Sequence, residues 1–273
     1  MARFTNQAQL AYRNRITTSN IAVGEILEVL SAAKHAVVET YESYDVITYV
    51  VSLVNSGTTA LTGLVLTDNL GAYTFNEASL FPLQYVANSL KYYVNGVLQT
   101  SPVIASQEPL QIEGISIPAQ GNAVVIYQAA LTQFAPSATN STITNQAVIS
   151  GTGISSITVE ETISALAEPI LNITKSISPV PVTENGALTY TFVIENRGNV
   201  PADPVDLIVI TDQFNPILSD LTVTFNGTAW AEGTQYTYDQ TTGLFTTKAG
   251  EITVPAATFT QNADTGAWSV IPG

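Results

Sequence analysis

The chain has 273 residues, a formal net charge of −14 and no cysteine. A hydrophobic fraction of 45% is high enough to form a packed core, which excludes an intrinsically disordered chain. Without cysteine there are no disulfides and no thiolate metal sites, and the eight scattered basic residues form no stripe that could bind nucleic acid.

Residues 1–26 predict a β-hairpin whose sequence occurs a second time inside the chain. The segment FTNQAQLAYRNRITTSNIAVGEI, from Phe4 to Ile26, is similar to ITNQAVISGTGISSITVEETI, from Ile143 to Ile163. The motif TNQA is identical at Thr5–Ala8 and Thr144–Ala147. Residues 1–26 are alternating and polar, so we expect no classical signal peptide here, and no apolar run in the chain reaches membrane-spanning length.

Residues 27–166 predict a first β-sandwich. The stretch VITYVVSLVN at Val46–Asn55 is rich in β-branched residues, as strands are, and Asn95-Gly96 is a strong hairpin signal. The stretch GEILEVLSAAKHAVVETY, at residues 24–41, is compatible with a short helix. The internal repeat described next favours an extended linker that runs into the first strand instead.

Residues 167–273 repeat the first sandwich in the same order. The matched positions are Lys34 and Lys175, Asn55 and Asn196, Asp68 and Asp212, and Asn95-Gly96 and Asn226-Gly227. A counterpart of the internal TNQA motif would fall beyond Gly273. We therefore expect the second sandwich to lack its closing strands, which residues 1–26 resemble.

The segments LNITKSISP, LTYTFVIENRGN and IVITDQF, between Leu171 and Phe214, resemble the repeat family known as DUF11. The family pattern is a lysine, a tyrosine-rich strand that ends in Asn-x-Gly, a strand with aspartate, and Asn-x-Ala. Here these positions are Lys175, Tyr190, Asn196, Gly198 and Asp212, and in the first repeat Lys34, Tyr49, Asn55, Gly57, Asp68, Asn145 and Ala147.

This resemblance implies an all-β chain of two tandem Ig-like β-sandwiches, the second of them incomplete, preceded by an N-terminal donor hairpin. It also implies a stalk or spacer role outside the cell, on a bacterial or archaeal surface. The displaced N-terminal hairpin departs from the family pattern and is similar to self-assembling appendage subunits, including spore appendages. The expected location is therefore a cell or spore surface.

Two Lys-Asp-Asn sets are candidates for spontaneous amide cross-links of the kind that sandwich domains of pilins form. One set is Lys34, Asp68 and Asn145 within the chain. The other is Lys175 and Asp212 with Asn6 of a neighbouring subunit. A solvent-facing lysine, a turn-capping asparagine and an aspartate that accepts a backbone bond fit the same residues, so both interpretations stand.

Other catalytic or metal chemistry has little support in the sequence. His35 is the only histidine, so a Ser-His-Asp triad would need unusual partners. Asp203, Asp206 and Asp212 lack the tight loop spacing of a calcium site, and we interpret them as solvated or capping acids. We predict no enzyme, no cofactor and no metal site.

The leading hypothesis is a structural subunit of an extracellular filament, assembled head to tail by donor-strand complementation. Residues 1–26 of one subunit would complete the second sandwich of the next, giving a homopolymer. Residues 1–24 carry a charge of +3 and residues 167–273 a charge of −8, which would steer this association. The side chains expected to enter the acceptor are Asn6, Ala8, Leu10, Tyr12, Ile21 and Val23.

The alternative hypothesis is an adhesive or ligand-binding pair of sandwiches from a surface protein. Its candidate platform is aromatic: Trp230, Trp268, Tyr236 and Tyr238. A glycan or a protein could be the ligand, and a surface anchor protein could be a further partner, but the sequence identifies neither.

Overall fold

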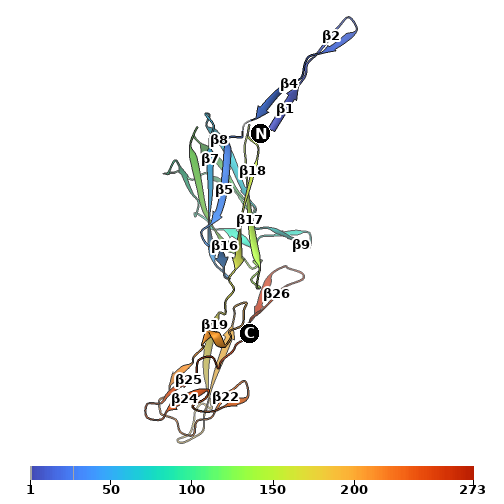
Figure 1. Cartoon of the computed structure of the whole chain (residues 1–273). Helices are drawn as coiled ribbons and strands as arrows, with labels where there is room; N and C mark the ends of the chain where they lie inside the picture. The colour runs from blue at the N-terminus through green and yellow to red at the C-terminus, as the bar shows by residue number, and fades with distance from the viewer. Residues whose placement is uncertain (1, 27) are drawn as a thin grey trace. The chain divides into compact units, whose positions relative to one another are not determined.

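The computed structural model describes residues 2–26 and 28–273, and it confirms the expected all-β fold (Figure 1). Besides strands, the described residues contain one short 3-10 helix, η1 (Pro204–Asp206). They include no helix with the length and apolar character needed to cross a membrane. Two compact units are present. Unit 1 holds the chain up to Ala135 together with Thr142–Ser164, and unit 2 holds Pro136–Ser141 and Ala165–Gly273.

Unit 1 contains two six-stranded sheets. The first has the order β13-β12-β16-β7-β5, with β11 also paired to β16, and the second has the order β14-β15-β8-β17-β18-β6. The first sheet is built from β5 (Leu30–Ala36), β7 (Val46–Asn55), β11 (Leu83–Tyr85), β12 (Lys91–Val94), β13 (Val97–Gln99) and β16 (Asn122–Leu131). The second is built from β6 (Thr40–Tyr41), β8 (Leu61–Asp68), β14 (Val103–Gln107), β15 (Leu110–Ile117), β17 (Thr142–Ser150) and β18 (Ile157–Ala165), and β9 (Tyr73–Phe75) and β10 (Ala78–Leu80) form a separate hairpin.

The inner faces of these two sheets enclose one core. Along β7 the alternate residues Tyr49, Val51 and Leu53 are fully buried, and the residues between them are half-buried, as the period of a strand requires. A hydrogen bond from Lys34 of the first sheet to Asp68 of the second joins the two layers. Unit 1 is therefore a closed β-sandwich.

Turn chemistry explains several strand ends. Asn95 and Gly96 both have positive φ values, 48° and 78°, and connect β12 to β13 as the hairpin signal predicts. The Asn-x-Gly motif that ends β7 also has a structural role. The Asn55 side-chain oxygen accepts the backbone N–H of Gly57, and its nitrogen donates to the carbonyl of Thr59.

The described part of the stretch with helical composition is extended and not helical, as the repeat predicts, although its first residues belong to a strand where an extended linker was expected. It contributes β4 (Ala22–Ile26) and β5. Strand β4 pairs with β1 (Ala2–Asn6), and β2 (Gln9–Tyr12) pairs with β3 (Arg15–Thr18), so residues 2–26 form one long hairpin. The ring of Phe4 lies over Gly24 on the opposite strand, where an added Cβ atom would clash with it. The hairpin has no core of its own, since Leu10, Tyr12 and Ile16 are all more than half exposed.

Unit 2 repeats the first strands of unit 1 with the same register. Lys34 of β5 lies opposite Val51 of β7, and Lys175 of β19 lies opposite Phe192 of β20, seventeen positions along in both cases. The strands of unit 2 are β19 (Leu171–Ser178), β20 (Thr189–Asn196), β21 (Thr211–Gln213), β22 (Val223–Phe225), β23 (Thr228–Trp230), β24 (Tyr236–Asp239), β25 (Leu244–Thr247), β26 (Thr258–Gln261) and β27 (Trp268–Ile271).

Strand neighbours differ between the units. In unit 1, Asp68 of β8 lies opposite Leu110 of β15 on one side and Ala147 of β17 on the other. In unit 2, Asp212 of β21 lies opposite Phe245 of β25, and among the described residues β21 has no second neighbour. Strand β21 is therefore an edge strand where β8 is a central one.

A second open edge lies along β20. Strand β7 is sandwiched between β5 and β16, whereas within residues 28–273 β20 pairs with β19 alone as a strand. The backbone N–H of Asn196 donates to the carbonyl of Gly273, as that of Asn55 donates to Gly121 directly before β16. The part of unit 2 that the structure describes thus contains no counterpart of β16, β17 or β18.

Candidate functional site

Unit 1 contains a buried ion pair between its two sheets. Lys34 extends from β5 and Asp68 stands at the end of β8; both side chains are fully inaccessible, and the Lys34 Nζ atom lies 2.5 Å from an oxygen of Asp68. The hydroxyl of Tyr127 donates to the same Asp68 oxygen, and the backbone N–H of Leu70 donates to the other at 2.8 Å. The carboxylate is therefore held in place from three directions.

Lys34 has an unusual environment for an amine. Burial lowers the pKa of its ammonium group, and the charge and hydrogen bond of Asp68 oppose that shift, as does the more distant charge of Glu161. The Nζ atom also lies over the ring of Tyr49, 4.9 Å from its centre. Burial thus moves this lysine towards the neutral form in which an amine is nucleophilic.

Asn145 of β17 completes this cluster. Its side chain is fully buried, yet among the described residues neither its oxygen nor its nitrogen has a hydrogen-bond partner. Burial raises the pKa values of the phenols of Tyr49 and Tyr127, and in both cases a side-chain interaction with Asn145 has a smaller, opposing effect. The carboxamide of Asn145 therefore lies close to both hydroxyls, although it makes no hydrogen bond of regular geometry with them. An unpaired buried carboxamide costs free energy and requires an explanation.

We call Lys34, Asp68 and Asn145 the closed cluster. It brings an amine, a carboxyl group and a carboxamide together in a site without access to water. Such a set has the components for forming an amide between lysine and asparagine. The sequence identified these three residues, and it identified Tyr49 as a position of the family pattern without a role in this site. It did not identify Tyr127, whose only signal is its inward position on an alternating strand.

Unit 2 contains a second Lys–Asp pair with the same separation, and this pair is partly exposed to solvent. The Lys175 Nζ atom lies 2.5 Å from an oxygen of Asp212, the distance found in unit 1. Here, however, the lysine side chain is 40% exposed and the aspartate 15%. Lys175 also lies over the rings of Tyr190, Phe192 and Phe214, at 4.5, 5.6 and 5.4 Å from their centres.

Apolar side chains around Lys175 are exposed as well. On β19, Ile173 and Ile177 flank the lysine on the same face and are 48% and 41% exposed. On β20, Tyr190, Phe192 and Ile194 are half-buried, although their counterparts in unit 1 are fully buried. We call this surface the acceptor face: Leu171, Ile173, Lys175, Ile177, Tyr190, Phe192, Ile194 and Asp212.

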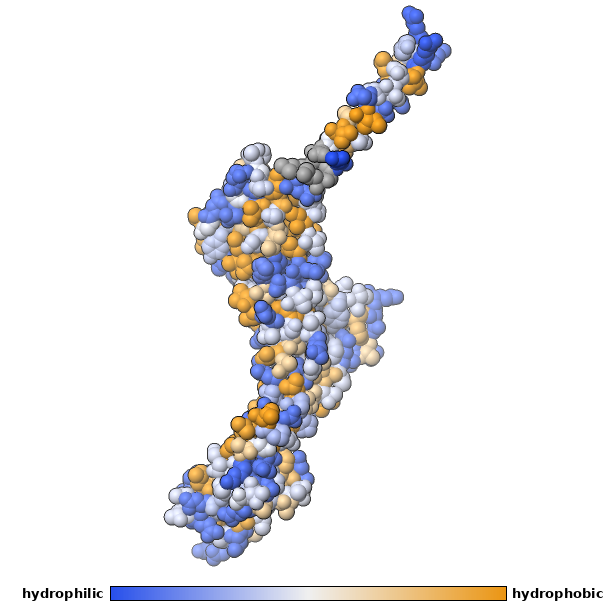
Figure 2. Space-filling model, viewed as in Figure 1, coloured by the Kyte–Doolittle hydropathy of each residue, from blue (hydrophilic) through white to orange (hydrophobic). Residues whose placement is uncertain are grey.

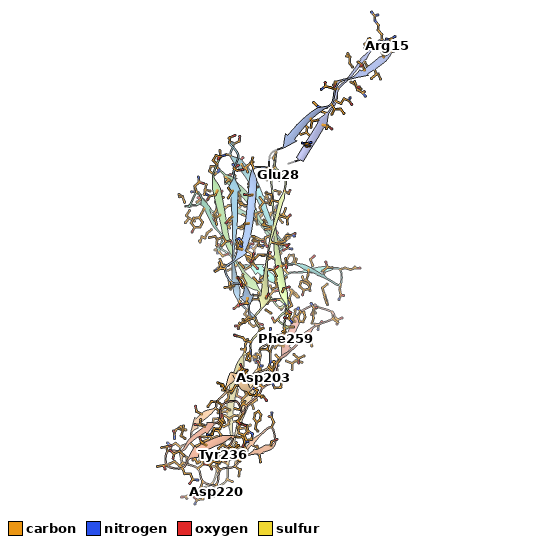
Figure 3. The ribbon with its side chains drawn as sticks, viewed as in Figure 1. Arg15, Glu28, Asp203, Asp220, Tyr236 and Phe259 are labelled. Carbon is orange, nitrogen blue, oxygen red and sulfur yellow. The ribbon has the colours of Figure 1, made fainter. Side chains whose placement is uncertain are left out.

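The N-terminal hairpin has the register of the strand pair that covers the closed cluster. Asn6 lies opposite Ala22, and Asn145 lies opposite Glu161, sixteen positions along in both hairpins. Apolar and polar surface alternates along the hairpin (Figure 2). Arg15 lies at its tip, next to Arg13 and Asn14, which turn the chain with positive φ values (Figure 3).

The pairing corrects one part of the expected donor face. Directly opposed residues of an antiparallel pair share a face. Asn6 therefore shares its face with Ala22, whereas Val23 pairs with Thr5 on the other face. Val23 consequently cannot enter a core together with Asn6. Ile21 precedes β4 and lies two positions from Val23, so in an extended chain it shares the face of Val23 and not that of Asn6. Leu10 and Tyr12 of β2 remain candidates for the inserted face.

The structure also tests the expected aromatic platform and the expected capping role of the acidic residues near η1. Tyr236 and Tyr238 are buried in a core with Phe214 and Phe245, and Trp230 packs against it, so these side chains form no exposed aromatic platform. The carboxylate of Asp206 accepts the backbone N–H of Asp203 at the start of η1, which is the capping role expected of these acids. The described residues contain no cluster of three acidic or histidine side chains suited to a metal ion.

Replacing Lys34 with methionine should destabilise unit 1 strongly. The change leaves the Asp68 carboxylate buried without its counter-charge, which typically costs about 3–5 kcal/mol. Chemical denaturation of the variant measures the loss. Lys91→Met is the matched control, because Lys91 is exposed on β12 and its replacement should change stability by less than about 0.5 kcal/mol. Equal stabilities would show that the buried pair is unimportant.

No protein-family model and no curated protein sequence matches the chain. Similar solved structures include the major pilin subunit BcpA of Bacillus cereus, at 9% identity over 98% of this chain and 73% of that one, with a TM-score of 0.37. The pilus backbone of Streptococcus pneumoniae is 11% identical over 89% and 55%, with a TM-score of 0.36. A collagen-binding subdomain of a surface protein of Enterococcus faecalis is 8% identical over 51% and 97%, with a TM-score of 0.31.

Proposed function

We propose that this protein is the structural subunit of an extracellular filament on a cell or spore surface. Residues 1–26 of one copy lie along β21 of the next copy and cover its acceptor face. The contact joins two different surfaces, so it repeats from copy to copy and gives a chain of subunits instead of a closed pair.

One observation carries this proposal: the same Lys–Asp pair is fully buried in unit 1 and partly exposed in unit 2. In unit 1, β17 pairs with β8 beside Asp68 and Tyr127 of β16 donates to Asp68, while the described part of unit 2 has no strands in the positions of β16, β17 and β18. An uncovered edge strand beside apolar side chains attracts a further strand. The hairpin that matches β17 and β18 in sequence and register is exposed from Arg3 to Val23.

The register of unit 1 specifies how the hairpin pairs with β21. Ala147 lies opposite Asp68, and Ile149 lies opposite Leu66. Carried over by the shared TNQA motif, Ala8 of one copy lies opposite Asp212 of the next, and Leu10 opposite Ile210. Backbone bonds along β21 then supply affinity, and the alternate side chains of β2 cover the apolar strip.

Charge supports the same pairing, because the hairpin is basic and unit 2 is acidic. Replacing Arg3, Arg13 and Arg15 with glutamine should slow filament elongation severalfold at low salt, since attraction between opposite charges accelerates encounter. At about 1 M salt, where the Debye length is only about 3 Å, the variant and the parent should elongate at similar rates. Light scattering during assembly measures both rates. An unchanged rate at low salt would show that charge does not steer the association of subunits.

Electron microscopy of the purified full-length protein tests the proposed function directly. A filament subunit should form fibres whose amount increases with protein concentration. An adhesive module that works as a single copy should remain dispersed at every concentration, and that result would contradict the proposal.

A further inference from the structure

We infer that subunits of the filament are joined covalently, by an amide bond between Lys175 of one copy and Asn6 of the next. This inference rests on the proposed assembly and adds a reaction to it. The reaction is spontaneous, and both reacting groups come from this chain.

The closed cluster of unit 1 serves as the template. Asn145 lies two residues before Ala147, the residue opposite Asp68, and its carboxamide is buried with no hydrogen-bond partner among the described residues. Lys34 is bonded to Asp68 in the same enclosed site. Two amide-forming partners and an acid are thus collected where water cannot compete.

The hairpin brings the missing group to the acceptor face. Asn6 lies two residues before Ala8, as Asn145 lies two residues before Ala147. With Ala8 opposite Asp212, Asn6 faces the inside of the sandwich, beside Lys175 and the ring of Phe214. Lys175 and Asp212 already have the separation found in unit 1, so only the carboxamide has to arrive.

The chemical step balances without any other reagent. A proton passes from the Lys175 ammonium to the Asp212 carboxylate, which gives a neutral amine and a carboxylic acid. The amine lone pair attacks the Cγ atom of Asn6 while the acid gives its proton to the Oδ1 atom. The C–N bond to the Nδ2 atom then breaks, and the leaving nitrogen takes one proton from the attacking amine. The proton on the Oδ1 atom passes through Asp212 to the same nitrogen, so ammonium leaves and Asp212 is again a carboxylate.

Docking of the hairpin creates the conditions under which this reaction proceeds. In the free subunit the Lys175 side chain is 40% exposed to water. A docked hairpin excludes that water, and a low-dielectric environment favours the neutral Lys–Asp pair over the charged one. The hairpin therefore provides the carboxamide and also the burial that activates the amine, so subunits in solution do not react.

Denaturing gel electrophoresis of full-length filaments, boiled in detergent, is the test. The expected result is a ladder of covalent oligomers, and proteolytic mass mapping should find the Lys175 and Asn6 peptides joined with the loss of one ammonia. Lys175→Arg keeps the positive charge beside Asp212 but cannot form this amide, so its ladder should disappear, as should that of Asn6→Ala. Lys248→Arg and Asn20→Ala, both at exposed positions outside the Lys–Asp–Asn sets, are the matched controls and should keep the ladder.

The outcomes separate this inference from the proposed function. Filaments that dissolve entirely into monomers of full calculated mass would overturn the intersubunit bond and leave the donor hairpin in place. A ladder that persists in Lys175→Arg would also overturn it, because another residue would then be reacting. A protein that forms no filaments contradicts the assembly and the bond together. In the monomer, loss of one ammonia that Lys34→Arg abolishes would show the template reaction in unit 1.

Discussion

Deletion of residues 1–26 should abolish filament formation. The hairpin is the only segment of the chain that shares the TNQA motif with the strands covering the closed cluster. Without it, the acceptor face of each copy keeps its exposed isoleucines and its edge strand β21, and no copy carries the segment that covers them. Electron microscopy and sedimentation at several protein concentrations should show no fibres, while unit 1 keeps its own complete pair of sheets.

A peptide added in trans provides the rescue control. A peptide of residues 2–26 should bind the truncated protein without restoring fibres, because it covers the acceptor face but carries no further unit. Added to the full-length protein, the same peptide should shorten filaments by capping their open ends. Normal fibres from the truncated protein would mean that another surface drives assembly, and the donor proposal would have to be abandoned.

Much of this fold follows from local chemistry that the sequence displays. The Asn-Gly pairs at residues 95–96 and 226–227 require positive φ values, and both become the tight turns that were expected. The repeat also predicts that Lys175 and Asp212 lie together, although 37 residues separate them and 34 separate Lys34 and Asp68. The register of β19 with β20 matches that of β5 with β7, so the two lysines have equivalent positions. Repetition within one chain thus predicts three-dimensional contacts that composition alone does not.

Other features depend on contacts that a linear pattern does not encode. An alternating strand has two faces, and the sequence does not say which one of β4 accompanies Asn6; the cross-strand pairing of Thr5 with Val23 decides it. Aromatic residues have the same ambiguity. Tyr236 and Tyr238 would suit a binding platform by composition, but opposing rings of Phe214 and Phe245 enclose them.

The absence of a β16 counterpart in the described part of unit 2 is a further feature that the sequence pattern did not predict. The repeat predicts that the second sandwich lacks its closing strands, and the hairpin matches only β17 and β18. Because Tyr127 lies on β16, the described part of unit 2 has no counterpart of the Tyr127 hydroxyl that donates to Asp68. The Asp212 side chain is correspondingly more exposed than that of Asp68, as expected for a site that a neighbouring subunit would complete.

Leu10→Asp should weaken assembly far more than Gln9→Asp, although the two residues are adjacent. Leu10 corresponds to the fully buried Ile149, and Gln9 corresponds to Val148 on the half-buried outer face of β17. Loss of one buried leucine removes about 1.5–3 kcal/mol, and the buried carboxylate adds further cost. A loss of about 3 kcal/mol weakens association more than about a hundredfold.

The neighbouring substitution is the matched control for this experiment, since both variants add one negative charge to the same strand. Gln9→Asp should change assembly by about 0.5 kcal/mol or less, as substitutions on an outer face usually do. Leu10 is 62% exposed in the free chain, so Leu10→Asp should leave the monomer folded, which circular dichroism can verify. The critical concentration for filament formation is the measurement. A one-residue slip of the hairpin would exchange the two faces and reverse the order of the variants, whereas equal critical concentrations would show that β2 does not insert into the acceptor face.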